Sequence, residues 1–210
     1  GVSLESGETL PCGAVILATG GLSYPSTGST GDGHRMASQA GLKVIPPRPS
    51  LVGLLTKEDW PRQLQGLSLK NVCLRGVSCG KIIYSELGEM LFTHFGISGP
   101  LALELSAHLP ENGQGQALLD LKPGLSPEQL DHRLTRELAA AGKKQLSTAM
   151  QTLLPQRFAA LFPGLCGLDG AMLCCQITAA QRSLIGRMLK ELPLTITALR
   201  PLSEAIITRG

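Results

Sequence analysis

The segment from Ala14 to His34 constrains the fold most, because an apolar run of strand length leads directly into a loop rich in glycine. The run AVILAT has the continuous hydrophobicity typical of a strand buried on both faces of a sheet. Five glycines follow, at positions 20, 21, 28, 31 and 33. Glycine loses more conformational entropy on folding than any other residue, so this density indicates a close approach of something to the backbone.

A short helix is expected directly after this loop. Met36, Ala37 and Ala40 recur at helical spacing, and Gly41 suits the position just beyond a helix C-terminus. Strand, glycine loop and helix form half of a nucleotide-binding unit, in which the amide groups of residues 31–33 could meet a phosphate. Because the G-x-G-x-x-G fingerprint does not occur in these residues, a tight strand-to-helix turn without a ligand is the alternative interpretation.

Strand-like pieces dominate most of the chain outside this unit. VSLESGETL predicts a β-hairpin near the N-terminus, and PPRP then breaks regular structure. After it, LVGLLT, LKNVCLRGV and KIIYSELGEMLFT have the length and spacing of a small antiparallel sheet or barrel. FGISGPLALELSAHL predicts a helix with Ser98 as its N-cap, and the following QALLDLKP predicts one more strand.

A helical region follows, before the chain returns to strands. Ser126 and Gln129 form a capping box with proline between them, which predicts a helix. Further helices are expected from about Lys144 to Leu154 and over RFAALF, before Pro163. Another opens at Thr178, which has Gln181 three residues on as in a capping box, and LTITALRPLSEAIITRG then contains two strand-like pieces.

Composition excludes several classes of function. Aromatic residues are only 3% of the chain, and the net charge of +3 is spread without a like-charge run longer than Lys143-Lys144, so no nucleic-acid partner is expected. No apolar segment approaches the ~20 residues that span a bilayer, so no membrane association is expected. Six cysteines without a C-x-x-C motif predict free thiols in a reducing cytoplasm and no metal site.

Four stretches resemble signatures of one protein family: AVILATGGLSYPSTGSTGDGHRMA, LQGLSLKNV, GEMLFTHFGISGP and LPLTITALRPLSEAIITRG. They follow the order found in the BaiN-type NAD(P)/FAD-dependent oxidoreductases, bacterial flavoproteins also called the aminoacetone oxidase family. The resemblance covers nearly the whole chain, and ATGGLSYPSTGSTGDG and FTHFGISGP are its most specific blocks.

The resemblance implies an α+β fold, in which part of a Rossmann-like FAD-binding domain is followed by a β-barrel-like domain with a helical insertion. The expected parts are a partial FAD domain at 1–48, a β-rich domain at 49–123, a helical subdomain at 124–192 and return strands at 193–210. The backbone of the ATGG segment would then lie along FAD, and the loop after it farther along the cofactor. The cofactor-binding residues so implied are Ala18, Thr19, Gly20, Gly21, Ser29, Thr30, Gly31 and Asp32.

The resemblance also implies that the chain is the middle portion of a protein about twice this length. The family's N-terminal FAD fingerprint, its acidic ribose-binding residue and its C-terminal flavin-binding block do not occur in these residues. We therefore expect FAD to bind in the full-length parent, and the fragment alone to be inactive.

The segment THFGISGP is the part of the inserted domain that the resemblance brings nearest to the flavin or the substrate. His94, with Thr93 beside it, could donate a proton to a carbonyl or alkene, because histidine titrates near neutral pH. The helix start at Ser98 and Gly99 could favour an anionic reduced flavin. Alternatively, Thr93 and His94 only join a strand end to a helix cap.

These features predict a flavoprotein oxidoreductase that transfers hydride between NAD(P)H, FAD and an unidentified small-molecule substrate. The choice between NADH and NADPH, and the oligomeric state, are left open. One alternative is a non-catalytic inserted domain for substrate capture or subunit contacts that does not bind FAD by itself. Another is an independent nucleotide-binding module without flavin.

Overall fold

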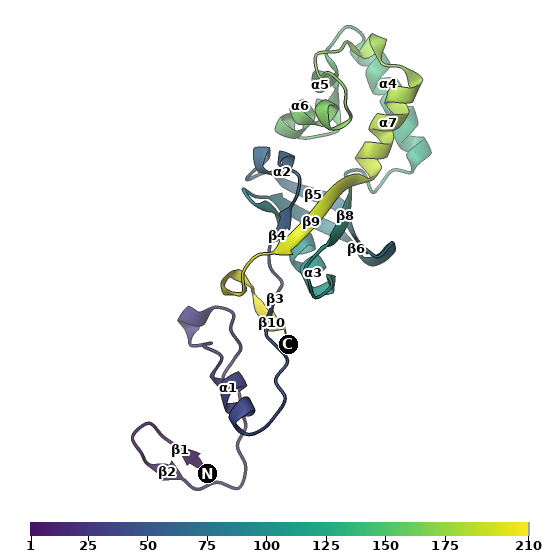
Figure 1. Cartoon of the computed structure of the whole chain (residues 1–210). Helices are drawn as coiled ribbons and strands as arrows, with labels where there is room; N and C mark the ends of the chain where they lie inside the picture. Colours follow the sequence, from purple (N-terminus) through teal and green to yellow (C-terminus); the bar gives the residue numbers. More distant parts are fainter. Residues whose placement is uncertain (210) are drawn as a thin grey trace. The chain divides into compact units, whose positions relative to one another are not determined.

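The computed structural model describes residues 1–209 and divides into two compact units (Figure 1). The larger unit runs from Leu51 to Arg200, and the smaller one combines Gly1–Ser50 with the last residues from Pro201. Among the described residues, no helix is both long and apolar enough to cross a bilayer.

The larger unit contains a closed β-barrel of six strands, each antiparallel to its neighbours. This barrel confirms the predicted α+β class with a barrel-like domain. The order around the barrel is β4-β7-β6-β5-β8-β9. The strands are β4 (Leu54–Thr56), β5 (Ser68–Ser78), β6 (Lys81–Phe92), β7 (Gly96–Ser98), β8 (Gly115–Asp120) and β9 (Leu192–Leu199).

The longest strands, β5 and β6, form a hairpin with a two-residue turn. Ser78 pairs with Lys81, and the two residues between them, Cys79 and Gly80, have φ angles of 49° and 73°. Positive φ at both positions is the pattern of a type I′ turn, whose twist matches that of the flanking strands. The predicted pieces LKNVCLRGV and KIIYSELGEMLFT are therefore the two arms of one hairpin.

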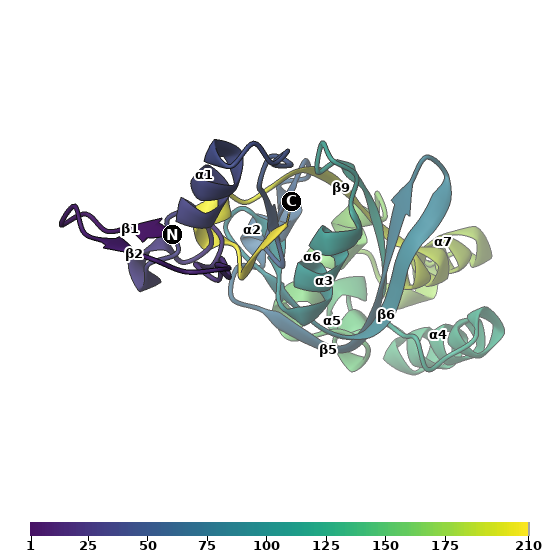
Figure 2. The same cartoon turned by 90° about the horizontal axis from the view of Figure 1, so that it is seen from below.

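Helix α3 (Pro100–His108) packs against the barrel beside β5 and β6 (Figure 2). It buries Leu101 and Leu105, and a Cβ at Gly88 would lie only 3.1 Å from Leu101. The expected N-cap at Ser98 is wrong, because the N-cap residue is Gly99 and no side chain caps the helix. Ser98 instead ends β7 and pairs with Leu91.

The helical region lies between β8 and β9 and contains α4 (Pro127–Ala141), α5 (Leu146–Ala149), α6 (Gln156–Leu165) and α7 (Ala179–Lys190). Both predicted capping boxes form, at Ser126 with Gln129 and at Thr178 with Gln181. Helices α4 and α7 lie side by side (Figure 1). The short helix α2 (Trp60–Gln63) brings Trp60 to within 5.8 Å of the Phe158 ring of α6, so barrel and helices share one core.

Two helices differ from their predicted ranges. The helix expected from Lys144 begins only at Leu146, because Gln145 pairs with Leu173 in a β-bridge that keeps the preceding backbone extended. The helix expected to stop before Pro163 continues to Leu165. Pro163 removes one intrahelical hydrogen bond, and only Gly164 and Leu165 follow it before the helix ends.

The smaller unit has little regular structure. It contains the hairpin β1 (Val2–Ser3) and β2 (Thr9–Leu10), helix α1 (Asp32–Gln39), and the antiparallel pair β3 (Arg48–Ser50) and β10 (Ile207–Arg209). The predicted hairpin and helix are confirmed. The strand expected at residues 14–19 is wrong: this run is irregular, and Ile16 is 92% exposed. No strand of the described chain pairs with it, and a strand is stable only when its backbone groups are paired.

Candidate functional site

A single hydroxyl group holds the start of the glycine-rich loop in place. Thr208 of β10 accepts hydrogen bonds on Oγ1 from the backbone amides of Leu22, at 2.7 Å, and Ser23, at 3.0 Å. The Ser23 hydroxyl lies 3.2 Å from the same oxygen. A Cβ at Gly21 would collide with the Thr208 side chain, so glycine is needed for this approach. Gly21 therefore faces the protein's own β10.

Other glycines of the loop also serve its own packing. Gly20 has a φ of 75°, and a Cβ there would lie 2.7 Å from Ser29 Oγ. Gly31 is the N-cap of α1 with a φ of 81°. A Cβ at Gly33 would collide with the hydroxyl of Thr19. Several glycines of this loop are thus required by contacts within the protein itself, without any ligand.

A cavity of about 280 Å³ nevertheless opens beside this loop. It brings together three of the predicted cofactor residues, Ala18, Thr19 and Gly20, with Gly33 and His34. Nδ1 of His34 is buried and has no hydrogen-bond partner among the described residues. A buried polar atom without a partner is costly, which makes this nitrogen available to a ligand in the cavity.

The geometry suits an uncharged part of a flavin cofactor better than a phosphate. Asp32 occupies the first turn of α1, where its carboxylate accepts a hydrogen bond from Thr30 and pairs with Arg35. This negative charge opposes a phosphate at the helix start, although the backbone dipole there would favour one. Backbone groups, the Thr19 hydroxyl and the His34 nitrogen can hydrogen-bond ring or hydroxyl groups. The residues present therefore fit an uncharged part of the cofactor, but not its phosphates.

The remaining predicted cofactor residues of the loop do not line this cavity. Ser29, Thr30 and Gly31 follow the 3₁₀ turn Pro25–Thr27, with Ser29 packed beside Gly20. The sequence analysis singled out the glycines but not His34 as a cofactor residue. The only sequence signal for His34 is its position in the first turn of the helix that follows the loop.

The predicted catalytic residues lie in the larger unit, in the loop between β6 and β7. The Thr93 amide donates to the Gly96 carbonyl at 2.9 Å, but Oγ1 of Thr93 is buried and lacks a partner within residues 1–209. His94 is exposed, and its ring contacts the Phe95 ring at 5.0 Å in an edge-on arrangement. The Arg200 guanidinium lies 4.6 Å above the Phe95 ring. A hydroxyl, an imidazole and a cation thus occur together on one loop and its neighbour.

The backbone of this loop depends on Gly96. Its φ is 149°, and a Cβ there would collide with the Leu54 carbonyl and lie 2.8 Å from the Thr56 nitrogen. Ser98 and Gly99 come next, as the end of β7 and the N-cap of α3. The barrel therefore fixes the position of Thr93 and His94 relative to the start of α3.

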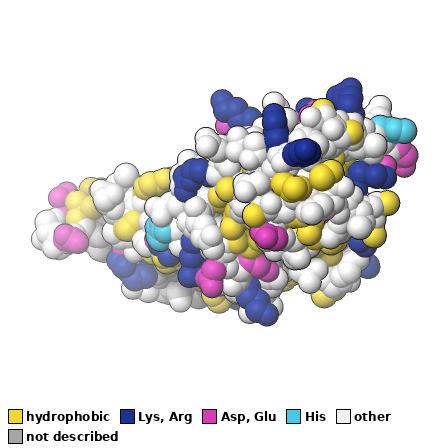
Figure 3. Space-filling model, turned by 90° about the horizontal axis from the view of Figure 1, so that it is seen from above, with side chains coloured by type: hydrophobic (Ala, Val, Ile, Leu, Met, Phe, Trp, Pro, Cys, Tyr) yellow, Lys and Arg dark blue, Asp and Glu magenta, His cyan; other side chains and the backbone are white. Residues whose placement is uncertain are grey.

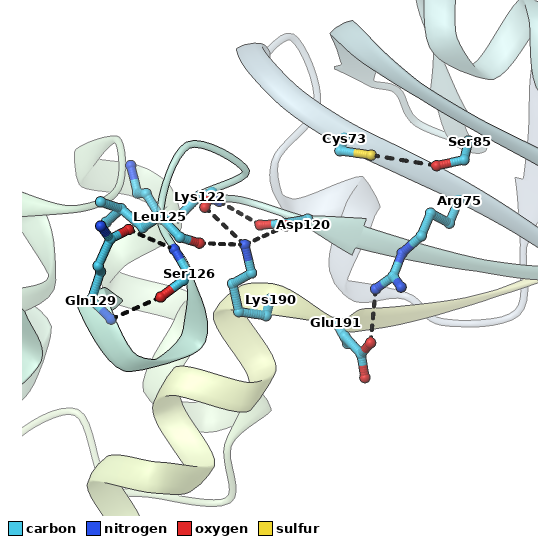
Figure 4. A network of polar contacts seen from close by, with 10 residues as sticks. All are labelled: Cys73, Arg75, Ser85, Asp120, Lys122, Leu125, Ser126, Gln129, Lys190 and Glu191. Carbon is cyan, nitrogen blue, oxygen red and sulfur yellow. Dashed lines mark hydrogen bonds and ion pairs between the residues drawn. The ribbon is translucent and has the colours of Figure 1, made fainter. Parts of the chain in front are cut away.

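A larger cavity that the sequence analysis missed lies where α7 meets the barrel (Figure 4). Its volume is about 610 Å³. Lys190 Nζ lies 2.6 Å from Asp120 Oδ2 and donates to the backbone carbonyls of Lys122 and Leu125. Arg75 and Glu191 are 2.8 Å apart. These pairs join residues far apart in the sequence, and no sequence pattern marks them.

Thiols and metal ligands form no further site. Among the described residues, no group of three or more His, Cys, Asp or Glu could hold a metal ion. All six cysteines are free, and burial raises the pKa of the Cys166 thiol to about 12. A thiol with so high a pKa is a poor nucleophile.

The curated proteins similar to the chain include the following three. A ribosomal RNA dihydrouridine synthase of Haemophilus influenzae is 37% identical over 153 residues, which are 72% of this chain and 36% of the relative. A ribosomal RNA dihydrouridine synthase of Escherichia coli is 36% identical over 108 residues, 49% of this chain and 25% of the relative. A 3-dehydro-bile acid delta(4,6)-reductase of Clostridium scindens is 30% identical over 130 residues, 59% of this chain and 31% of the relative.

The chain thus spans about a third or less of the length of these relatives. The similarity to the bile acid reductase agrees with the predicted resemblance to the BaiN-type flavoproteins. The family model described as "HI0933-like protein barrel and H2TH domain" matches residues 48–207, which include the six-stranded barrel and the helical region. The chain therefore belongs to the HI0933-like barrel and H2TH domain family.

Proposed function

We propose that the protein is a flavin-dependent reductase of a carbon–carbon double bond conjugated to a carbonyl group. The observation that carries this proposal is the chemistry shared by the names of the relatives. A dihydrouridine synthase adds two hydrogens to the uracil ring, and a delta(4,6)-reductase removes double bonds from a 3-oxo steroid. In both cases hydrogen is added across an alkene that a carbonyl polarises.

When bound, FAD would supply hydride chemistry with NAD(P)H as the electron donor, and the protein would position cofactor and substrate. The cavity beside the glycine loop receives part of the cofactor, with backbone contacts from Ala18, Thr19 and Gly20. Nδ1 of His34 accepts a hydrogen bond from the cofactor or donates one to it. Ser29, Thr30, Gly31 and Asp32 contact hydroxyl groups farther along the cofactor.

His94, with Thr93 beside it, is the proposed proton donor to the substrate. Hydride addition to a conjugated alkene leaves negative charge on the carbonyl oxygen and the adjacent carbon, and that carbon must then be protonated. A positioned acid typically contributes about 10²–10⁴-fold to the rate of such a step. The exposed His94 imidazole is suited to give this proton, and the Thr93 hydroxyl, which lacks a partner among the described residues, is suited to donate a hydrogen bond to the carbonyl oxygen.

Ribosomal RNA is the proposed substrate class, which replaces the expectation from composition that the protein has no nucleic-acid partner. Two of the three relatives are named for it, and they have the higher identities to this chain. Residues 122–191 also contain nine Lys and Arg against five Asp and Glu, so this region carries an excess of positive charge. Such an excess favours binding to the phosphate backbone of a nucleic acid. Action on this substrate would place the protein in the cytoplasm.

A small molecule is the second candidate substrate. The similarity to the bile acid reductase favours it, as does the expectation from the sequence that the substrate is small. The cavity of about 610 Å³ beside α7 could receive such a molecule, because its lining presents more apolar than polar surface and its charged residues Arg75, Glu191, Lys190 and Asp120 pair with one another.

The test uses the full-length protein encoded by the gene that contains this chain. The purified protein is examined for visible flavin absorbance and is then incubated with NADPH or NADH and ribosomal RNA from cells that lack the gene. Mass spectrometry of the digested RNA should show uridine that has gained two hydrogens. A parallel reaction contains a 3-oxo-4,6-diene steroid instead of RNA, and reactions without nicotinamide nucleotide serve as controls.

The outcomes separate the candidates. Dihydrouridine formation supports the RNA substrate, and reduction of the steroid alone supports the second candidate. A protein that binds no flavin and reduces neither compound would contradict the proposed reaction and favour the non-catalytic alternative. Replacing Thr93 by Val or His94 by Asn should lower kcat about 100-fold or more and leave the flavin absorbance unchanged.

A further inference from the structure

We propose that a cationic groove formed by Lys70, Lys122, Arg133 and Arg136 binds the sugar–phosphate backbone of the RNA substrate. This inference rests on the RNA substrate proposed above. It assigns the RNA contact to one face of the larger unit, where the start of β5, the loop between β8 and α4, and α4 itself lie next to one another.

Two adjoining hollows make up the cationic groove. The first, of about 350 Å³, is lined by Lys70, Lys122 and Arg133. The second, of about 450 Å³, follows α4 and is lined by Arg133 and Arg136, with His132 and Gln129 beside them. Leu125 and Arg133 line both hollows, so the two form one continuous surface.

The charge of the cationic groove has a single sign. Within the described residues, no Asp or Glu lines either hollow. The carboxylate of Glu137 forms ion pairs with two of the four cations, at 3.7 Å from Arg133 Nε and 3.8 Å from a terminal nitrogen of Arg136. These distances are longer than those of hydrogen bonds, and one carboxylate cannot neutralise four cations.

This arrangement differs from that of the cavity of about 610 Å³ beside α7. There, Arg75 pairs with Glu191 and Lys190 pairs with Asp120, so those cations are neutralised inside the protein. Such pairs join α7 to the barrel and leave little charge for a ligand. The cationic groove is therefore the better candidate for an anionic partner.

Like charges are close together in the cationic groove. The pKa of Lys122 is lowered, first because the side chain is partly buried and second because Arg133 lies nearby. A phosphate placed between these two side chains would offset their repulsion and favour the charged form of Lys122. The free protein thus carries an electrostatic cost that an anion removes.

The side chains also have the chemistry of backbone contacts. Arginine and lysine are the usual partners of phosphate oxygens, and these contacts position a protein on a nucleic acid without reading its sequence. Arg136 is 75% exposed, and Lys70 is exposed at the start of β5. The space-filling view in Figure 3 shows Lys and Arg side chains on one face of the molecule, with Asp and Glu side chains among them.

The test replaces two exposed cations at opposite ends of the cationic groove, in the variant Lys70→Gln with Arg136→Gln. The control variant is Lys57→Gln with Lys81→Gln, which removes the same charge from exposed positions of the larger unit that line neither hollow and lie outside residues 122–191. The 210-residue chain and both variants are titrated with deproteinised ribosomal RNA at several salt concentrations. Melting temperatures are measured to show that all three proteins are folded.

The groove variant should bind RNA more weakly. The logarithm of its association constant should also fall less steeply with the logarithm of the salt concentration, with a slope smaller in magnitude by about two. The control should change affinity only slightly, through the lower net charge. Equal effects in the two variants, or no binding of RNA by the unaltered chain at physiological salt, would overturn the proposal that the cationic groove binds RNA. If either of these results occurs and the full-length protein still forms dihydrouridine, the proposed reaction is supported. The RNA must then contact a different part of the protein.

Discussion

At the scale of single residues, the hydroxyl of Thr208 links two segments that are 185 or more positions apart in the sequence. It is the acceptor for two backbone amides at the start of the glycine-rich loop, whose N–H groups would otherwise need water. The approach is possible because residue 21 is glycine. The position of the predicted cofactor loop therefore depends on a residue of the last strand.

Replacing Thr208 by Val should increase the local mobility of the loop at Leu22 and Ser23. Valine has nearly the same shape but no acceptor, so the amides of Leu22 and Ser23 would lose their partner. A lost hydrogen bond to a part-buried group costs about 1–3 kcal/mol, which corresponds to a loss of hydrogen-exchange protection of about 5- to 160-fold. Exchange of these two amides, followed by NMR, measures the effect.

Thr208→Ser is the matched control for this variant, because it keeps the hydroxyl and removes only a methyl group. It should retain most of the protection of Leu22 and Ser23. Equal protection in the valine variant and the unaltered chain would show that Thr208 does not hold the loop.

At the scale of secondary-structure elements, an ion pair holds α4 and α7 together. Arg182 of α7 donates from Nε to Asp131 of α4 at 2.8 Å, with a second contact of 3.4 Å. The hydrogen bond from Arg182 is the main cause of a pKa of Asp131 below its usual value of 3.8. Apolar contacts of Leu134 and Ile185, both fully buried, complete the helix pair.

The contribution of Asp131 to stability should therefore depend on pH. A carboxyl whose pKa is lower in the folded state stabilises the protein above the unfolded-state value, and this stabilisation is lost as the pH falls through the folded-state value. The variant Asp131→Asn should be slightly less stable than the unaltered chain at neutral pH. The difference should disappear in acid, below the pKa of the folded state.

Urea unfolding at a series of pH values measures this difference. Arg182→Gln should reproduce the loss at neutral pH, and the double variant should add little to either single change, because both remove the same pair. A difference that persists unchanged in strong acid would show that Asp131 acts through packing rather than charge.

At the scale of the whole molecule, the larger unit has its own closed barrel and its own core. The hydrophobic cluster extends from Leu54 to Ile196 and lies entirely within this unit. Lys190 of α7 adds polar contacts to Asp120 and to two carbonyls of the loop before α4. The smaller unit, in contrast, exposes Ile16, Leu42 and Ile45.

A polypeptide of residues 51–200 should therefore fold by itself. It should unfold in urea in one cooperative transition, because all strands of the barrel and the shared aromatic core are present. Its midpoint should be close to that of the main transition of the 210-residue chain. A broad transition without a defined midpoint would mean that the barrel needs contacts from the smaller unit.

The sequence by itself determined the local elements. Capping boxes at Ser126 and Thr178 predicted α4 and α7, because such signals act within a few residues along the chain. Strand-length pieces bounded by turns predicted most of the barrel strands. The motifs FTHFGISGP and ATGGLSYPSTGSTGDG predicted the family, which the match over residues 48–207 confirms.

Only the tertiary structure decided which residues meet. The run at 14–19 reads as a buried strand but is irregular, because strand formation depends on a partner that no local pattern supplies. The unpaired nitrogen of His34, the contact of Thr208 with the glycine loop and the cationic groove all join residues through the fold. Their interactions depend on distance in space and on burial, and neither quantity is encoded in the spacing of residues along the chain.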